Sequence, residues 1–171
     1  MYILIKNLNY CYAGIEKKWI LNGQIHRAKG AAIKNSNGEE WWVNGKRHRK
    51  DAPAMIKFIG EERWFWEGSL HRENGPAVKT AFGEEYWYFH GDHYIQQENG
   101  TKEFCSIKSI NSNLGSILLH RDNDLPAVEY PNGDKEWWCL GIRHRLNGPA
   151  VIYGNKQFWF EFGEFIKCTV A

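Results

Sequence analysis

Short apolar stretches alternate with glycine-containing turns along this chain, and that pattern predicts β-strands rather than helices. Residues 77–80 and 150–153 alternate or run apolar over about four positions, as short strands do. The Asn-Gly pairs Asn37-Gly38 and Asn132-Gly133 supply the positive φ that a tight hairpin needs, and the pairs Asn22-Gly23 and Asn44-Gly45 are expected to turn the chain again. After such turns, residues 40–43 are expected to form a return strand. No segment shows a 3.6-residue period with helix caps.

One sequence unit recurs along the chain. Its centre is a His-Arg pair, and Pro-Ala follows five residues after the His, or six in one case, with Ala31-Ala32 in this place after the first pair. In four units a Trp precedes the His by seven residues and a Gly precedes it by three, which gives W-x3-G-x2-H-R-x-x-G-P-A. The pairs begin at His26, His48, His71, His120 and His144. The pattern predicts an all-β fold, an array of short antiparallel β-hairpin repeats that forms an elongated twisted meander sheet.

The array predicts one β-repeat domain over residues 1–171. Residues 1–18 are expected to form an N-terminal cap, 19–95 regular repeats, 96–117 an irregular break with an insertion, and 118–171 resumed repeats with a C-terminal cap. The break is recognised because Tyr94-Ile95 occupies the place of a His-Arg pair and 104–117 matches no repeat.

Tryptophans mark equivalent places in the repeats and are expected to stack along one face. The members of this row are Trp19, Trp41, Trp64, Trp87, Trp137 and Trp159. Trp42 follows Trp41 directly, and neighbours on a strand point to opposite faces. Either the sheet curls until one face becomes a core, or one aromatic face binds a partner.

The recurring unit, with its Asn-Gly turn and Glu-x-Trp segment, resembles the MORN-like repeat proteins of bacteriophages and giant viruses. The resemblance covers most of residues 19–163. It implies an all-β hairpin array, a viral origin, an intracellular life in the infected host, and a scaffold or binding role rather than chemistry. The chain departs from the pattern at Ala31, Ala52, Leu125, Tyr94 and Ile95.

Composition adds few constraints on function. The 171 residues carry 22 Lys and Arg against 20 Asp and Glu, and this balance does not indicate a nucleic-acid or membrane partner. No apolar stretch is long enough for a membrane-spanning helix, so a cytoplasmic location is expected, the host cytoplasm for a viral protein. Cys11, Cys105, Cys139 and Cys168 form no CxxC pair, and are expected to be free, partly buried thiols without a metal or cofactor.

The His-Arg pairs admit two interpretations. Five arginines along one edge would form a cationic stripe that suits phosphates. These residues are Arg27, Arg49, Arg72, Arg121 and Arg145. The favoured interpretation is structural: each Arg pairs with a Glu of a neighbouring repeat, such as Glu39, Glu62 or Glu85, and each His bonds a turn carbonyl.

Other candidate chemistry is weak. His90 and His93 have no third metal ligand near them in sequence. The adjacent carboxylates at 39–40, 61–62 and 84–85 point apart on a strand, which disfavours acid–base catalysis. We therefore expect no enzyme.

The leading hypothesis is a non-enzymatic viral protein that binds a host protein and inhibits or redirects it, with anti-defence activity as the natural use. One alternative is a sponge that sequesters a nucleotide-like signal molecule. A second is single-stranded nucleic-acid binding on an aromatic and basic face. The oligomeric state stays open.

Function is expected where the repeat fails, because regular positions are explained by folding. The predicted binding surface comprises the 104–117 segment and the residues His90, Asp92, His93, Tyr94, Phe104 and Lys108. A tolerated insertion without a role is the alternative for 104–117.

Overall fold

The computed structural model describes residues 2–9, 14–106 and 118–171. In this part of the chain every regular element is a β-strand, 22 in all, and every pair of strands is antiparallel. The all-β hairpin array expected from the sequence is therefore confirmed. The chain divides into two compact units, Met1–Gly91 and Asp92–Ala171, called unit 1 and unit 2 below.

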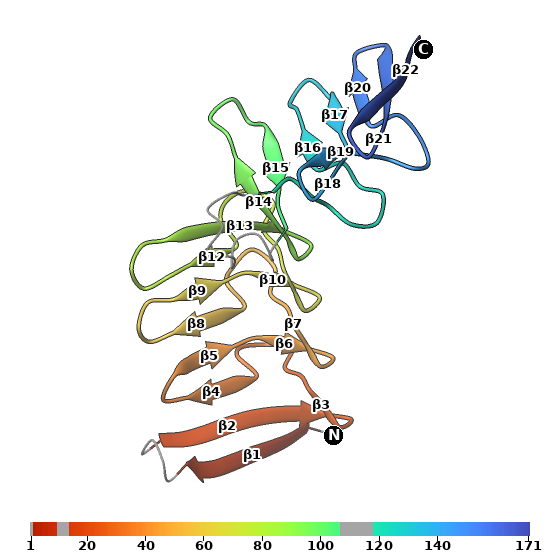
Figure 1. The fold of residues 1–171 in the computed structure, drawn as a ribbon. Helices are drawn as coiled ribbons and strands as arrows, with labels where there is room; N and C mark the ends of the chain where they lie inside the picture. Colours follow the sequence, from red (N-terminus) through yellow and green to blue (C-terminus); the bar gives the residue numbers. More distant parts are fainter. Residues whose placement is uncertain (1, 10–13, 107–117) are drawn as a thin grey trace. The chain divides into compact units, whose positions relative to one another are not determined.

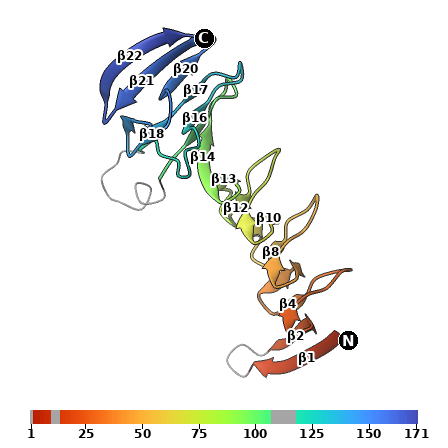
Figure 2. The ribbon, with the colours of Figure 1, turned by 90° about the vertical axis from the view of Figure 1, so that its right-hand side faces the viewer.

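Unit 1 contains thirteen of these strands (Figure 1). They are β1 (Tyr2–Asn9), β2 (Gly14–Leu21), β3 (Gln24–Ile25), β4 (Ile33–Asn35), β5 (Gly38–Glu40), β6 (Trp42–Val43), β7 (Lys46–Arg47), β8 (Met55–Lys57), β9 (Glu62–Arg63), β10 (Phe65–Trp66), β11 (Ser69–Leu70), β12 (Val78–Lys79) and β13 (Glu85–Phe89). Its main ladder runs β1-β2-β4-β5-β8-β9-β12-β13. The pairs β6-β7 and β10-β11 form separate short hairpins. Figure 2 shows the repeats of unit 1 following one another in chain order.

Unit 2 repeats the same plan. Its strands are β14 (Asp92–Gln96), β15 (Lys102–Phe104), β16 (Val128–Glu129), β17 (Lys135–Glu136), β18 (Trp138–Cys139), β19 (Ile142–Arg143), β20 (Val151–Tyr153), β21 (Lys156–Glu161) and β22 (Glu164–Val170). The main ladder of unit 2 runs β14-β15-β16-β17-β20-β21-β22, and β18-β19 is its short hairpin.

In three repeats the Trp lies between two strands, not inside one: Trp41, Trp64 and Trp137. β5 ends at Glu40 and β6 begins at Trp42, so the chain leaves the main ladder at Trp41. The Trp41 N–H donates to the carbonyl of Ala54 at 2.8 Å, and the Trp41 carbonyl accepts from the N–H of His48 at 3.1 Å. The prediction of an unbroken return strand over 40–43 is therefore wrong. Trp41 and Trp42 belong to different segments instead of opposite faces of one strand.

The predicted turns are confirmed at the short hairpins. Asn44 and Gly45 have φ values of 48° and 76°, and Asn22 and Gly23 have 49° and 79°. Positive φ at both central residues is the type I′ geometry that matches strand twist. In the long hairpin of β4 and β5, glycine is required for a different reason. A Cβ on Gly38 would lie 2.1 Å from the carbonyl oxygen of Ile56 on the adjacent strand, so the two backbones approach too closely for any other residue.

The buried interior combines the alanine of each Pro-Ala pair with larger apolar residues such as Met55, Val78 and Val151. The Ala of the Pro-Ala pair is fully buried at Ala54, Ala77, Ala127 and Ala150. Of the Trp row, Trp137 is buried, whereas its repeat equivalents are half-buried. The expected stacking of one tryptophan on the next is not found among the described ring contacts. Trp19, Trp41, Trp64 and Trp137 each pack on an arginine, as described below, and Trp159 packs on Lys167.

The irregular centre differs from the expected insertion. The Phe104 N–H donates to the Ala127 carbonyl at 2.8 Å, and the Phe104 carbonyl accepts from His120 N–H at 3.0 Å, which are the two bonds of a repeat Trp. Phe104 is therefore a repeat residue. The extra residues follow it, between Cys105 and Leu119, whose bridge corresponds to the Trp42–Arg47 pair of a regular short hairpin.

Candidate functional site

Each arginine of a His-Arg pair packs its guanidinium on the aromatic ring that begins its repeat. The Arg Cζ atoms lie 3.6–4.0 Å from the ring centroids, the range of a cation–π contact. The pairs are Arg27–Trp19, Arg49–Trp41, Arg72–Trp64, Arg121–Phe104 and Arg145–Trp137. This contact holds the long arginine side chain in one orientation.

The loop after the His-Arg pair closes over the guanidinium. Nη1 of Arg72 donates to the carbonyl oxygen of Pro76 at 3.1 Å, and Arg49 bonds Pro53 in the same way at 3.1 Å. A Cβ on Gly75 would lie 3.0 Å from Cζ of Arg72, so the guanidinium is enclosed between Trp64 and this glycine. The Trp, Arg, Gly and Pro of the motif are thus parts of one packed unit.

In four of the five His-Arg pairs the histidine connects its repeat to the next. Nδ1 of His26 accepts the main-chain N–H of Asn44 at 3.1 Å, and Nδ1 of His144 accepts that of Phe162 at 3.2 Å. His48 and His71 make the same bond. The predicted bond from His to a turn carbonyl is wrong, since Nδ1 accepts here. The structural interpretation of the pair holds with different partners.

The predicted Arg–Glu ladder is also wrong. Glu39 pairs with Lys34 at 2.6 Å and Glu85 with Lys79 at 3.2 Å, each across its own hairpin. Within the described chain, Glu62 makes no ion pair with an arginine of a His-Arg pair. The Nε and Nη2 atoms of each such arginine form an edge, called the fork below, that is not used in the contacts above.

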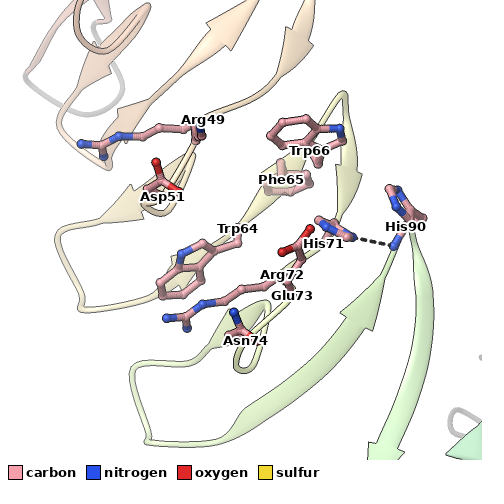
Figure 3. A pocket seen from close by; sticks show the side chains of 11 residues that line it. Arg49, Asp51, Trp64, Phe65, Trp66, His71, Arg72, Glu73, Asn74 and His90 are labelled. Carbon is pink, nitrogen blue, oxygen red and sulfur yellow. Dashed lines mark hydrogen bonds between the residues drawn. The ribbon is translucent and has the colours of Figure 1, made fainter. Parts of the chain in front are cut away.

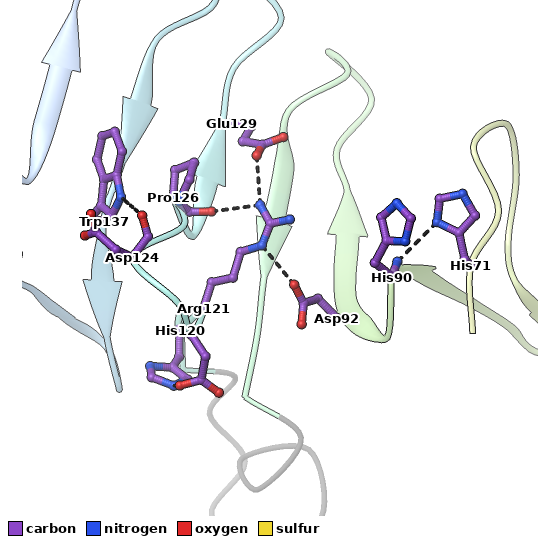
Figure 4. Close-up of polar contacts among 10 residues, drawn as sticks. His71, His90, Asp92, His120, Arg121, Asp124, Pro126, Glu129 and Trp137 are labelled. Atoms are coloured by element: carbon purple, nitrogen blue, oxygen red, sulfur yellow. Dashed lines mark hydrogen bonds and ion pairs between the residues drawn. The ribbon is translucent and has the colours of Figure 1, made fainter. Parts of the chain in front are cut away.

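In unit 2 the protein's own carboxylates bind these arginines. Nε and Nη2 of Arg145 donate to the two Oδ atoms of Asp124 at 2.8 and 2.9 Å. Nε of Arg121 donates to Oδ2 of Asp92 at 3.0 Å, and its Nη1 to Oε1 of Glu129 at 2.8 Å (Figure 4). Two-point binding of a carboxylate is the strongest use of a guanidinium edge.

In unit 1 the forks are open. Among the residues that the structure describes, no carboxylate oxygen lies within 4.0 Å of Arg27, Arg49 or Arg72, and their Nη1 atoms bond only loop carbonyls. Figure 3 shows the guanidinium ends of Arg49 and Arg72 pointing to the same side.

A groove of about 590 Å³ lies between two consecutive His-Arg loops of unit 1. Residues 49–51 line one side and 71–74 the other, with 64–66 between them and His90 at the end (Figure 3). Trp66 is 39% exposed there, and its ring lies 4.5 Å from that of His48. The groove presents cationic groups, an aromatic surface and the acids Asp51 and Glu73 together.

The equivalent groove of unit 2 measures about 240 Å³. It lies between residues 120–125 and 144–147, and Asp124 occupies the fork of Arg145 in it. The His120 loop is one residue longer than the others, and Asn123 and Asp124 both have positive φ, 62° and 55°. In the unit 2 groove the protein's own loop therefore occupies the arginine fork, whereas in the unit 1 groove the forks are unoccupied.

The groove histidine His71 favours its neutral form. Burial lowers the pKa of His71 below its ordinary value, and the neighbouring His90 lowers it further. The two rings lie 4.1 Å apart (Figure 4). The cationic character of the groove therefore comes from Arg49, Lys50 and Arg72.

The residues predicted to form one binding surface have different roles in the structure. His90 is exposed and lines the groove, whereas Asp92 is the partner of Arg121. Tyr94 and Phe104 are each 1% exposed, with rings 5.3 Å apart, so their side chains belong to the core, and including them in a binding surface was wrong. His93 is buried as well. Lys108 and the rest of 107–117 lie outside the described residues.

Sequence reasoning missed Trp66 and the difference between the two grooves. Trp66 could have been found, because Val43 and Cys139 occupy its place in other repeats. The closed fork of Arg145 had only one signal, the extra residue of the loop that carries Asp124.

The thiols lie in different surroundings. Cys105 is buried, Cys139 and Cys168 are exposed, and all three are free, while Cys11 is outside the described residues. Burial, with a contribution from Glu103, raises the pKa of the Cys105 thiol to about 11. No group of three or more His, Cys, Asp and Glu in the described ranges could hold a metal ion. Nothing helical in those ranges has the length and apolar character needed to cross a bilayer.

No protein-family model matches the chain, and no curated protein sequence matches it.

Proposed function

We propose that this chain is a non-enzymatic binding protein that engages another protein through the groove of unit 1. The observation that carries the proposal is the contrast between two equivalent grooves. In the unit 2 groove Asp124 occupies the fork of Arg145, whereas in the unit 1 groove the forks of Arg49 and Arg72 hold no carboxylate and lie beside Trp66. Folding needs the packing of Trp, Arg and Gly in both grooves. This packing does not involve the fork, so it does not explain why the forks of unit 1 hold no carboxylate.

The groove has the composition of a protein-binding surface. Arginine and tryptophan dominate binding energy at protein interfaces. Packing on Trp41 and Trp64 fixes Arg49 and Arg72 before any partner arrives, which reduces the entropy lost on binding. Asp51 and Glu73 on the same walls interrupt the continuous positive track that a nucleic-acid backbone needs.

The resemblance to MORN-like phage proteins supports a viral setting. In that setting the partner is a host protein, and occupation of its surface inhibits or redirects it. Anti-defence activity is the use we propose.

The test is affinity capture from host-cell lysate, with three versions of the chain on the resin. Trp66→Ala removes an exposed groove ring, and Phe82→Ala removes a ring that is 92% exposed outside the groove. We expect the wild type and Phe82→Ala to capture the same protein, and Trp66→Ala to lose it. Undiminished capture by Trp66→Ala contradicts the proposal.

A thermal-shift screen with nucleotides separates the proposal from a nucleotide sponge. A ligand that binds only the folded state stabilises it by mass action, so a sponge would gain several degrees at saturating nucleotide. We expect no such gain. Nucleotide-dependent stabilisation that Trp66→Ala removes would establish the sponge in place of the protein-binding function.

A further inference from the structure

We infer that unit 1 recognises an acidic segment of its partner, whose carboxylates enter the open forks of Arg49 and Arg72 in the groove and of Arg27 in the preceding repeat. The inference rests on the proposed function and adds the chemistry of the partner.

Unit 2 shows which group these forks accept. The fork of Arg145 holds both oxygens of the Asp124 carboxylate at 2.8 and 2.9 Å, and Nε of Arg121 holds Asp92 at 3.0 Å. Arg72 has the same ring contact and the same loop bond as Arg145, 4.0 against 3.9 Å to the ring, but no carboxylate among the described residues. A carboxylate from another molecule is the group that would complete it.

The packing of the guanidinium restricts how a ligand can approach. One face of Arg72 lies on Trp64, and a Cβ on Gly75 at the other face would lie 3.0 Å from Cζ. Neither face is open to a flat base, so stacking on the guanidinium is excluded. The edge remains, and an in-plane carboxylate matches it with two parallel hydrogen bonds.

The repeat spacing defines the acidic pattern. Each repeat adds two strands to the main ladder, as β5, β9 and β13 show. At about 4.8 Å per strand, equivalent forks follow one another at intervals of about 10 Å. A polyproline II segment rises about 3.1 Å per residue and turns once in three residues, so every third side chain shares one face at about 9.3 Å. Acidic residues at every third position therefore fit the three forks.

The first experiment measures binding of three labelled peptides to the whole chain. Glu-Pro-Ser-Glu-Pro-Ser-Glu carries the proposed spacing, a second peptide has the same composition with its three Glu adjacent, and a third has Gln for Glu. We expect the spaced acidic peptide to bind about tenfold or more tighter than the Gln peptide, and tighter than the adjacent one. Equal affinity for the Glu and Gln peptides overturns the inference.

Two variants change the number of open forks. Replacing residues 50–52 by Asp-Asn-Asp-Leu, the loop of residues 122–125, brings a carboxylate to Arg72 and closes its fork; we expect affinity for the spaced peptide to fall about tenfold. Asp124→Gly removes the carboxylate from the fork of Arg145 at a position of positive φ, and we expect a new, weaker peptide site in unit 2. Circular dichroism verifies that both variants stay folded. Unchanged peptide binding in both folded variants overturns the inference.

Competition identifies other anions. Inorganic phosphate or single-stranded DNA that displaces the peptide at lower concentration than free glutamate-rich peptide would overturn carboxylate selectivity.

The inference and the proposed function fail separately. If Trp66→Ala abolishes capture while no acidic peptide binds, the function stands and the acidic chemistry falls. If the spaced peptide binds while Trp66→Ala leaves capture intact, the forks stand and the proposed function falls.

Discussion

Nδ1 of His71 accepts a hydrogen bond from the main-chain N–H of His90, nineteen residues further along the chain, at 3.1 Å. Since Nδ1 accepts, it carries no proton, and the imidazole is neutral in the folded state. The same bond recurs from His26, His48 and His144 to the following repeat. Equivalent bonds therefore join consecutive repeats, and protonation of Nδ1 would remove the bond of His71.

Acid is expected to destabilise the protein through His71. Burial and His90 lower the pKa of His71 in the folded state, so the unfolded chain binds its proton more readily. The stabilisation is complete above about pH 6.5, the ordinary histidine value, and is lost as pH falls through the lowered folded value. His71→Asn keeps an acceptor oxygen that does not titrate, and we expect a flatter dependence of Tm on pH between 7 and 5.

Phe82→Ala is the control, since it removes a ring that is 92% exposed and no titratable group. It should keep the wild-type slope of Tm against pH. Burial also lowers the pKa of His93, so His71→Asn reduces the slope without abolishing it. A wild-type slope in His71→Asn would contradict the prediction.

Gly75→Ala should be more costly than Gly60→Ala. Both glycines have positive φ, +132° and +91°, but a Cβ on Gly75 would lie 3.0 Å from Cζ of Arg72, whereas a Cβ on Gly60 meets nothing within 4 Å. We expect losses in the free energy of unfolding of about 2–4 kcal/mol for Gly75→Ala and about 1–2 kcal/mol for Gly60→Ala. Urea unfolding measures both, and equal losses would show that the contact with Arg72 does not restrict this position.

The two repeat tryptophans at the grooves should differ in stability cost. Trp137 is 7% exposed and its Nε1 donates to the Asp124 carbonyl at 2.9 Å, whereas Trp64 is half-buried. Trp137→Ala should reduce the free energy of unfolding by about 3–5 kcal/mol, and Trp64→Ala by about 2 kcal/mol. Chemical denaturation measures the difference. Since both rings carry an arginine, at 4.0 and 3.9 Å, a larger loss for Trp64→Ala would mean that burial does not set the cost of removing these rings.

Glu136 is a buried carboxylate, 2% exposed, that accepts hydrogen bonds from four side chains. The donors are Tyr130, Tyr153, Trp138 and Arg143. Burial alone raises the pKa of Glu136, but the bonds from both tyrosines and the charge of Arg143 outweigh it and hold the pKa below its usual value. Glu136→Gln should cost about 2–4 kcal/mol at pH 7, because a neutral amide cannot accept all four bonds.

The stabilisation from ionised Glu136 is present above about pH 4.5 and is lost as pH falls through the lowered folded value. Unfolding followed from pH 7 to 3 should therefore show a smaller acid loss in Glu136→Gln than in the wild type. Glu40→Gln is the matched control, since Glu40 accepts from Trp42 and Arg47 at a half-buried position. If both variants lost the same free energy of unfolding at pH 7, the role of burial at Glu136 would be contradicted.

Local turn chemistry made much of the fold predictable. Asn44-Gly45 was identified as a turn because Asn and Gly tolerate positive φ, and this preference needs no tertiary information. The break at Trp41 was not predictable in this way. Residues 40–43 read as a continuous strand, and the carbonyl of Ala54, thirteen residues away, bonds the Trp41 N–H and diverts the chain.

The candidate site was predictable only in part. Recurrence singled out the arginines, but charge alone suggested Glu39 as a partner. The register places Lys34 directly opposite Glu39, so the lysine takes that carboxylate. The difference between an open and a closed fork depends on where one extra loop residue places Asp124, and composition does not encode that geometry.

The forward bonds of the repeats have a consequence for the growing chain on the ribosome. A repeat Trp bonds a carbonyl thirteen residues later, as Trp19 bonds Ala32, and a histidine such as His26 bonds the turn at Asn44, eighteen residues later. Each repeat of this kind is thus completed once about one further repeat has left the exit tunnel. Such short-range contacts permit folding from the N-terminus during synthesis, repeat by repeat, before the C-terminal strands are translated.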